Sequence, residues 1–145
     1  MTVSSSNDVL TADDIAFLRR PLHGFLSVAG GPNPPQPRPV WFEPTADGSI
    51  QLFTGPDSLH VRRLRRDPRA SIVVAAPATE RERWISVSGP ASIEAGGAHE
   101  LCERLAALYW DLEDPVRAND LKVLLGEAEW VRLVIQPEQV RRYAG

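Results

Sequence analysis

Residues 30–39 constrain the fold more than any other part of this sequence, because five of the ten are proline and two are glycine. Proline has no backbone N–H to donate and its ring fixes φ, so this segment can be neither a regular helix nor a central β-strand. Hydrophobic segments of strand length stand on either side of it, at 22–29 and 40–42. We therefore expect residues 30–39 to form a stiff loop between two antiparallel strands.

A tight hairpin is expected directly after this loop. Asp47-Gly48 is a strong turn signal, and it separates residues 40–42 from a return strand at 50–53. Other hydrophobic segments with β-branched residues at their centres also have strand character; these are residues 70–76, 84–94 and 130–135. Gly89-Pro90, inside one of these segments, predicts a bulge or bend.

Short helices are expected between the strands. Thr11 offers an N-cap hydroxyl, two acidic residues follow in the first turn, where the helix dipole favours negative charge, and Pro21 ends the helix. The other expected helices are residues 57–66, with Asp57 as the N-cap, 97–112, with leucines along one stripe, and 116–125.

Six strands in hairpin-like succession, interrupted by short helices, predict a mostly β (α+β) fold with an antiparallel barrel or curled sheet. The length of 145 residues fits a single domain with a substantial core. We expect residues 1–10 to be a flexible N-terminal tail and residues 11–145 to be the single domain.

Composition excludes several classes of protein. A formal net charge of −3 gives no reason to expect nucleic acid as a partner, and no apolar run approaches the roughly 18–20 residues that span a membrane. Cys102 is the single cysteine, and the three histidines lack the spacing of metal ligands, so no disulfide within the chain or metal centre is expected. The first residues lack the order of a signal peptide, which favours a cytoplasmic location.

No catalytic triad, phosphate-binding G-x-x-x-x-G-K or dinucleotide-binding G-x-G-x-x-G pattern is present in the sequence. Residues 52–69 nevertheless suit an anion: a strand ends, a turn follows, and a helix begins with small polar residues and continues with Arg62, Arg63 and Arg66. Helix N-termini bind anions through backbone N–H groups, and arginine adds bidentate donors. The alternative is an amphipathic surface helix whose arginines are solvated.

The order of these segments resembles the flavin-binding core of the pyridoxamine 5′-phosphate oxidase family. The matching features are an Asp-Gly turn, a strand ending in Phe53-Thr54, a short basic helix followed by Arg-Asp-Pro-Arg, and a hydrophobic strand. Residues 84–91 and 131–140 extend the similarity, which covers roughly residues 11–140. The flavin- and deazaflavin-dependent oxidoreductases that share this fold are similar in the same way. The resemblance implies a six-stranded antiparallel split β-barrel.

The resemblance also implies a homodimer with FMN at its interface and the cofactor phosphate held by basic residues. The cofactor-binding residues that it implies here are Arg38, Val40, Trp41, Phe42, Phe53, Thr54, Ser58, Leu59, His60 and Arg63. The chain departs from the family pattern at three positions: Leu59 stands where Arg is frequent, His60 where Lys is typical, and Glu43 where some members have Lys. Trp84, Tyr109 and Trp110 are further aromatic candidates for a ring pocket, with ordinary core packing as the alternative.

On this resemblance the chain is an FMN- or F420-binding oxidoreductase that transfers a hydride or electrons to a small organic substrate, with no catalytic side chain and no metal. The alternative is a non-catalytic split-barrel binding protein whose flavin site is weakened or lost, as the residues at 59 and 60 suggest. Haem or tetrapyrrole binding is a third reading, by fold analogy alone. Pyridoxamine 5′-phosphate oxidation itself is not expected, because the C-terminal basic substrate motif is missing. The identity of the substrate does not follow from the sequence.

Overall fold

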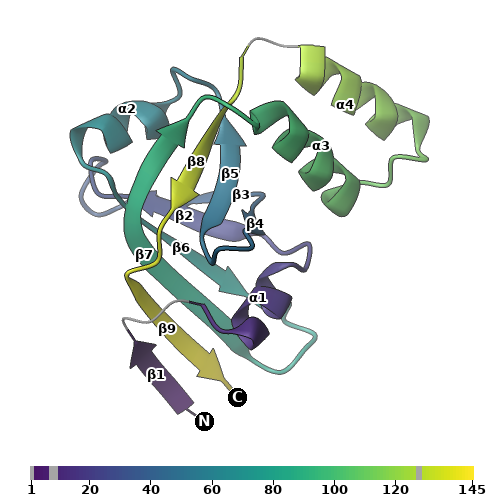
Figure 1. Ribbon diagram of the computed structural model, residues 1–145. Coiled ribbons are helices and arrows are strands. Elements are labelled where there is room, and N and C mark those ends of the chain that lie inside the picture. The colour runs from purple at the N-terminus through teal and green to yellow at the C-terminus, as the bar shows by residue number, and fades with distance from the viewer. Residues whose placement is uncertain (1, 7–9, 127–128) are drawn as a thin grey trace.

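The computed structural model describes residues 2–6, 10–126 and 129–145. A curled antiparallel sheet forms its centre and four helices lie around it (Figure 1). The strands are β1 (Thr2–Ser6), β2 (Gly24–Val28), β3 (Arg38–Val40), β4 (Glu43–Pro44), β5 (Ile50–Thr54), β6 (Arg69–Ala75), β7 (Arg83–Glu94), β8 (Val131–Ile135) and β9 (Gln139–Ala144). The helices are α1 (Ala12–Leu18), α2 (Leu59–Arg66), α3 (Ala98–Tyr109) and α4 (Pro115–Gly126). The predicted antiparallel, mostly β fold is confirmed, with three more strands in the described residues than the six expected.

The longest strand, β7, belongs to both halves of the sheet, whose strand order is β3-β2-β6-β7-β8-β5-β4. One edge of β7 pairs with β6, while the other edge pairs with β9 over its first six residues and with β8 over its last four. The change of partner falls at Gly89-Pro90, where the sequence predicts a bulge or bend. A Cβ on Gly89 would lie 1.8 Å from the carbonyl oxygen of Gln136. Only glycine therefore lets β7 and the segment after β8 approach so closely here.

The expected second strand is divided between the two halves of the sheet. Residues 40–42 were predicted to pair with the return strand, but Arg38–Val40 instead forms β3 and pairs with β2, and only Glu43–Pro44 pairs with β5 as β4. Trp41 and Phe42 carry the chain from one half to the other, and Phe42 is fully buried in the core. The predicted turn at Asp47-Gly48 is confirmed by a Gly48 N–H to Thr45 carbonyl bond of 3.1 Å.

Two further strands, β1 and β9, were not predicted from the sequence. Thr2–Ser6, within the flexible tail expected over residues 1–10, forms β1, which pairs along all five of its residues with β9. Residues 1 and 7–9 of that prediction lie outside the described residues. Pro137 ends β8 as expected, but the chain resumes as β9 two residues later. The exposed edge of β9 offers backbone donors and acceptors that a paired β1 satisfies.

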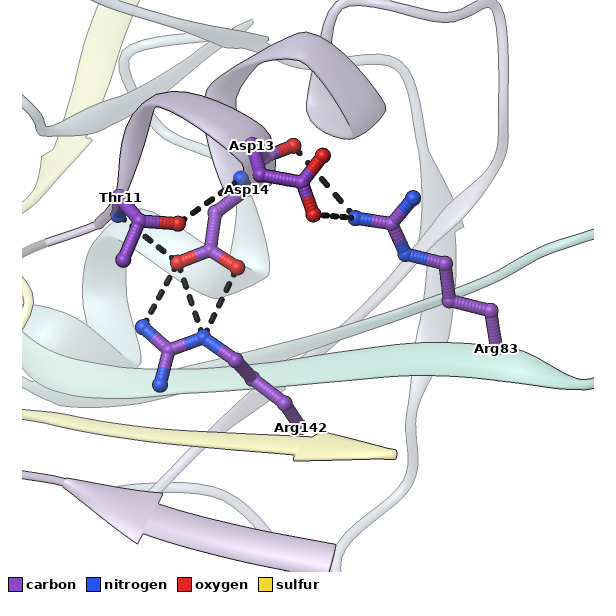
Figure 2. Close-up of polar contacts among 5 residues, drawn as sticks. All are labelled: Thr11, Asp13, Asp14, Arg83 and Arg142. Atoms are coloured by element: carbon purple, nitrogen blue, oxygen red, sulfur yellow. Dashed lines mark hydrogen bonds and ion pairs between the residues drawn. The ribbon is translucent and has the colours of Figure 1, made fainter. Parts of the chain in front are cut away.

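Helix α1 is joined to the strands β7 and β9 by two ion pairs (Figure 2). Thr11 caps the helix as predicted: its hydroxyl accepts from the Asp14 N–H at 3.1 Å, and the Asp14 carboxylate accepts from the Thr11 N–H at 2.8 Å. The same carboxylate, in a residue only 3% exposed, accepts from the Arg142 guanidinium of β9 at 2.7 Å. Asp13, which is exposed, pairs with Arg83 of β7 at 3.0 Å.

The remaining helices agree with the predicted segments, with one change of cap. The N-cap of α2 is Ser58 rather than Asp57, because the Ser58 hydroxyl accepts from the Val61 N–H at 3.3 Å. Helix α3 buries Leu101 and Leu105 completely. Helix α4 buries no side chain and packs beside α3, away from the sheet (Figure 1). Among the described residues, no helix is long and apolar enough to cross a bilayer.

The hydrophobic core lies inside the curl of the sheet, under α1 and α2. Its largest fully buried side chains in the described part of the chain include Leu18, Leu26, Phe42, Ile50, Leu52, Ile72, Leu133 and Ile135. The burial of alternate residues along β2 and β6 leaves the other face of these strands toward solvent.

Candidate functional site

A cavity of about 300 Å³ lies where the chain leaves β3 and crosses toward β4. Its walls come from the residue before β2, from β3 and the crossover, from the end of β5, and from the first turn of α2. The lining residues are His23, Arg38, Pro39, Val40, Trp41, Leu52, Phe53, Thr54 and His60. Segments from both halves of the sheet therefore meet at this cavity.

Part of the cavity is cationic. His60 lines it from α2 and is only 6% exposed, and burial first and then the charges of Arg38 and Arg63 lower its pKa below the ordinary value of 6.5. We call Arg38, His60 and Arg63 the cationic cluster. The His60 imidazole is therefore neutral near pH 7 unless an anion is close, while Arg38 and Arg63 supply the positive charge of the cluster.

The proline-rich loop is seated on α2 beside this cluster. A Cβ on Gly30 would lie 2.4 Å from the carbonyl oxygen of Arg63, so a larger residue would push the loop away from the helix. The guanidinium of Arg66 also donates to the Gly30 carbonyl at 3.3 Å. The Gly-Gly pair before the prolines thus lets the loop lie on α2, near the point where His60 and Arg63 project.

Another part of the cavity wall is aromatic. The Trp41 ring stacks on Tyr109 of α3 with centroids 5.0 Å apart and planes 13° apart, and the Trp110 ring meets Trp41 edge-on at 4.9 Å. We call Trp41, Tyr109 and Trp110 the aromatic wall. Phe53 lines the cavity from β5 and packs edge-on against Trp130 at 5.3 Å. Such contacts hold large rings in fixed orientations.

The structure brings together most of the residues that the family resemblance implied. Those that line the cavity are Arg38, Val40, Trp41, Phe53, Thr54 and His60. Those that do not line it are Phe42, which is in the core, Ser58, whose hydroxyl caps α2, Leu59, which is 45% exposed, and Arg63, whose charge acts on His60. Successive helical residues project about 100° apart, which explains why His60 faces the cavity and Leu59 does not.

Glu43 has a structural partner instead of a place in the cavity. Its carboxylate, at the start of β4, accepts from the Arg104 guanidinium of α3 at 2.7 Å and from the Gln51 amide at 2.7 Å. The Glu43 carboxylate therefore fastens α3 to the sheet. Tyr109, the last residue of that helix, and Trp110, its C-cap, contact the cavity-lining Trp41 from outside the cavity.

Three lining residues, His23, Pro39 and Leu52, were missed at the sequence level. His23 precedes β2 without any motif of its own, and it reaches the cavity because β2 pairs with β3. Leu52 was assigned only to the return strand. Among the described residues, no group of three or more His, Cys, Asp or Glu side chains is placed to hold a metal ion.

Comparisons with known proteins agree with this architecture. A family model described as pyridoxamine 5′-phosphate oxidase matches residues 11–135. A conserved hypothetical protein of Mycobacterium tuberculosis is 23% identical with a TM-score of 0.64, and the match covers 96% of this chain and 88% of that one. An F420 reductase is 21% identical with a TM-score of 0.65, over 86% of this chain and 93% of that one. The haem storage protein of Vibrio cholerae is 18% identical with a TM-score of 0.60, over 92% of each chain. No curated protein matches the sequence. The predicted split β-barrel fold is confirmed.

Proposed function

This chain belongs to the pyridoxamine 5′-phosphate oxidase family, and on that basis we propose that it is an oxidoreductase that binds FMN, or the deazaflavin F420, in the cavity beside β3. The observation that carries the proposal is one cavity lined by both cationic and aromatic side chains. A phosphate-bearing ring compound needs both kinds of surface. A purely apolar ligand would leave Arg38 without an anionic partner.

The cationic cluster suits the phosphate group. Arg38 supplies a bidentate donor, Thr54 a hydroxyl, and His60 a ring nitrogen at the start of α2, where the helix dipole adds partial positive charge. A bound phosphate would raise the pKa of His60 and favour its charged form. The histidine at the family's lysine position therefore gives a weaker site, and one that depends on pH.

The aromatic and apolar side chains suit the ring. Val40, Trp41 and Phe53 offer flat or branched surfaces that exclude water from a conjugated ring system. When bound, the ring supplies hydride or electron transfer to a small organic substrate, and the protein positions and tunes it. None of the chain's own side chains has to act as a nucleophile.

The size of the cavity favours a second copy of the chain. A volume of about 300 Å³ is at the lower end for ligand sites, so one chain would enclose only part of FMN. Next to the cavity, Pro39 lies opposite Phe25 on β2, and Phe25 lies opposite Val73 on β6. Phe25 and Val73 are 45% and 40% exposed. This apolar patch continues the cavity rim, and we propose that it is the dimer interface over which the cofactor is shared.

A non-catalytic binding protein is the second candidate. The observation that favours it is that His60 is buried and uncharged while Leu59 points to solvent, so two of the family's basic positions contribute no fixed charge. The variant His60→Lys shows whether position 60 lies at a flavin phosphate, because FMN affinity that does not change would mean that it does not. If the site is a weakened flavin site, the variant binds FMN about tenfold more tightly, as one new charge-assisted hydrogen bond predicts.

The first test is the visible absorption spectrum of the purified protein, followed by titration with FMN, riboflavin and F420. Arg38→Ala should weaken FMN binding and leave riboflavin binding unchanged, because riboflavin lacks the phosphate. Arg65→Ala is the matched control, since Arg65 is exposed on α2 and does not line the cavity. A protein that binds none of the three compounds would refute the proposal. A haem absorption band would favour haem or tetrapyrrole binding instead.

The dimer is tested separately by light scattering after size-exclusion chromatography. Phe25→Glu should convert the dimer to a monomer, because it places a charge in the apolar patch. A wild-type protein that is monomeric with FMN present would refute the shared site, even if it binds FMN.

A further inference from the structure

Tyr109 is fixed in place more firmly than a ring that merely fills space. Its hydroxyl donates to the carbonyl oxygen of Leu22 at 2.5 Å. Burial, opposed in part by the Phe42 backbone, raises the pKa of Tyr109 to about 12, so the phenol stays protonated and remains a donor at any physiological pH. Its ring stacks on Trp41.

The backbone partner of Tyr109 and the ring on which it stacks both belong to the cavity wall or adjoin it. Leu22 directly precedes the cavity-lining His23, and Trp41 lines the cavity itself. The Tyr109 ring lies 6.2 Å from the His23 ring and is tilted 55° to it. One side chain that does not itself line the cavity therefore contacts the segment before β2 and the Trp41 indole of the β3–β4 crossover.

Contacts of α3, and of the segment that follows it, fix the position of this tyrosine. The Arg104 to Glu43 ion pair ties α3 to β4, and Trp110 packs edge-on against Trp41. The guanidinium of Arg117, on α4, lies 4.7 Å above the Trp110 ring. The α3–α4 pair, which adds little to the sheet core, thus supports the aromatic wall.

We propose that Tyr109 is the positioning residue of the aromatic wall: it orients the Trp41 indole, and with it His23, so that a planar conjugated ring can pack in the cavity. One face of the indole is covered by Tyr109, so the surface of Trp41 that lines the cavity is on its remaining sides. This inference rests on the proposed function for its ligand, the flavin ring, but the orientation of Trp41 can be measured without any ligand.

The test compares Tyr109→Leu and Tyr109→Phe by two measurements. The first is the ¹⁵N–¹H spectrum of the tryptophan indoles in the ligand-free protein, with Trp41 assigned from Trp41→Phe. The second is titration with FMN and with riboflavin. Tyr143→Leu is the matched control, because Tyr143 stacks on Trp84 with centroids 5.9 Å apart and neither residue lines the cavity.

Tyr109→Leu should shift the Trp41 indole resonance and weaken FMN and riboflavin binding by the same factor, about tenfold, as expected for the loss of a stacked aromatic pair. The ratio of the two dissociation constants should not change, because the phosphate contacts are intact. Tyr109→Phe keeps the ring and should lose about threefold, the effect of one hydrogen bond. The control should move the Trp84 resonance and leave flavin binding unaltered.

An unshifted Trp41 resonance in Tyr109→Leu would overturn the inference. If the wild type binds flavin, an unchanged flavin affinity in Tyr109→Leu would overturn it too. If Tyr109→Leu does not fold, Tyr109→Phe decides by the same two measurements. If the wild type binds no flavin, the proposed function is refuted, and with it the flavin ring as the ligand of the aromatic wall. The Trp41 resonance still shows whether Tyr109 orients the wall.

Discussion

Replacing Asp14 by Asn tests how strongly the α1–β9 junction holds the fold together. Asp14 is almost completely buried, and its carboxylate accepts from Arg142 at 2.7, 2.8 and 3.0 Å and from the Thr11 N–H at 2.8 Å. Asparagine keeps the shape and one acceptor oxygen but removes the charge. The guanidinium of Arg142 would then lose its anionic partner.

The expected loss of stability follows from the burial of the two partners. Removing one member of a fully buried ion pair costs about 3–5 kcal/mol. The Arg142 side chain is 25% exposed, so it keeps part of its hydration, and the Asn oxygen can still accept one hydrogen bond. We therefore expect Asp14→Asn to lower the free energy of unfolding by about 2–3 kcal/mol at pH 7.

The difference between the variant and the wild type should depend on pH. Burial acts to raise the pKa of Asp14, but the hydrogen bonds from Arg142 and Thr11 outweigh it and lower the pKa below 3.8. The stabilising effect is therefore complete above the unfolded pKa, near pH 4, and is lost as the pH falls through the folded pKa. Below that range the two proteins should approach equal stability.

The assay is urea unfolding at pH 7 and at pH 3, at one protein concentration because the stability of the proposed dimer would depend on it. Asp13→Asn is the matched control: the Asp13 side chain is 85% exposed, and loss of its pair with Arg83 should cost between about 0 and 1 kcal/mol. A loss at pH 7 no larger for Asp14→Asn than for the control, or a loss that is unchanged at pH 3, would refute the reasoning.

Three further outcomes are expected. Gly89→Ala should destabilise the protein by about 3 kcal/mol or prevent folding, because a Cβ would collide with the Gln136 carbonyl; a wild-type urea midpoint would contradict this. Wild-type stability should fall as the pH drops below 6.5, since burial and then the arginines lower the pKa of folded His60 and the unfolded state takes up the proton first. The variant His60→Gln should lack this component. Equal slopes of the free energy of unfolding against pH in the two proteins, from pH 7.5 to 5.5, would count against it. Phe42→Ala should cost about 3–5 kcal/mol in urea unfolding as a core truncation, whereas a small loss would mean that Phe42 is not packed as described.

Elements with local signals could be predicted from the sequence, and those set by distant partners could not. Thr11, Pro21 and the Asp47-Gly48 turn act within a few residues, so the positions of α1 and the hairpin turn were found. The division of the second strand into β3 and β4 depends on which distant strand each piece meets. β9 was missed because Pro137 is a local stop signal, while the strand after it is held by pairing with β7.

At the candidate site, spacing alone suggested only an anion-binding helix start. The residues that line the cavity with His60, such as Arg38 and Trp41, came from the family resemblance, because they are far from it in sequence. His23 had no such signal: it is brought to the cavity by the pairing of β2 with β3 and by contact with Tyr109. The role of Glu43 could not be seen either, since its partner Arg104 is on α3, far from β4 in the sequence.

The strand β7 gives the molecule a single cooperative unit. Because its twelve residues are hydrogen-bonded to β6 and β9 at one end and to β8 at the other, neither half of the sheet can open without breaking bonds to a strand that the other half also needs. The backbone amides in the middle of β7 should therefore exchange with deuterium only through global unfolding, whereas amides of α4 should exchange through local opening. A ligand bound across both halves would slow both exchange in β7 and unfolding of the whole chain, without any contact to β7 itself.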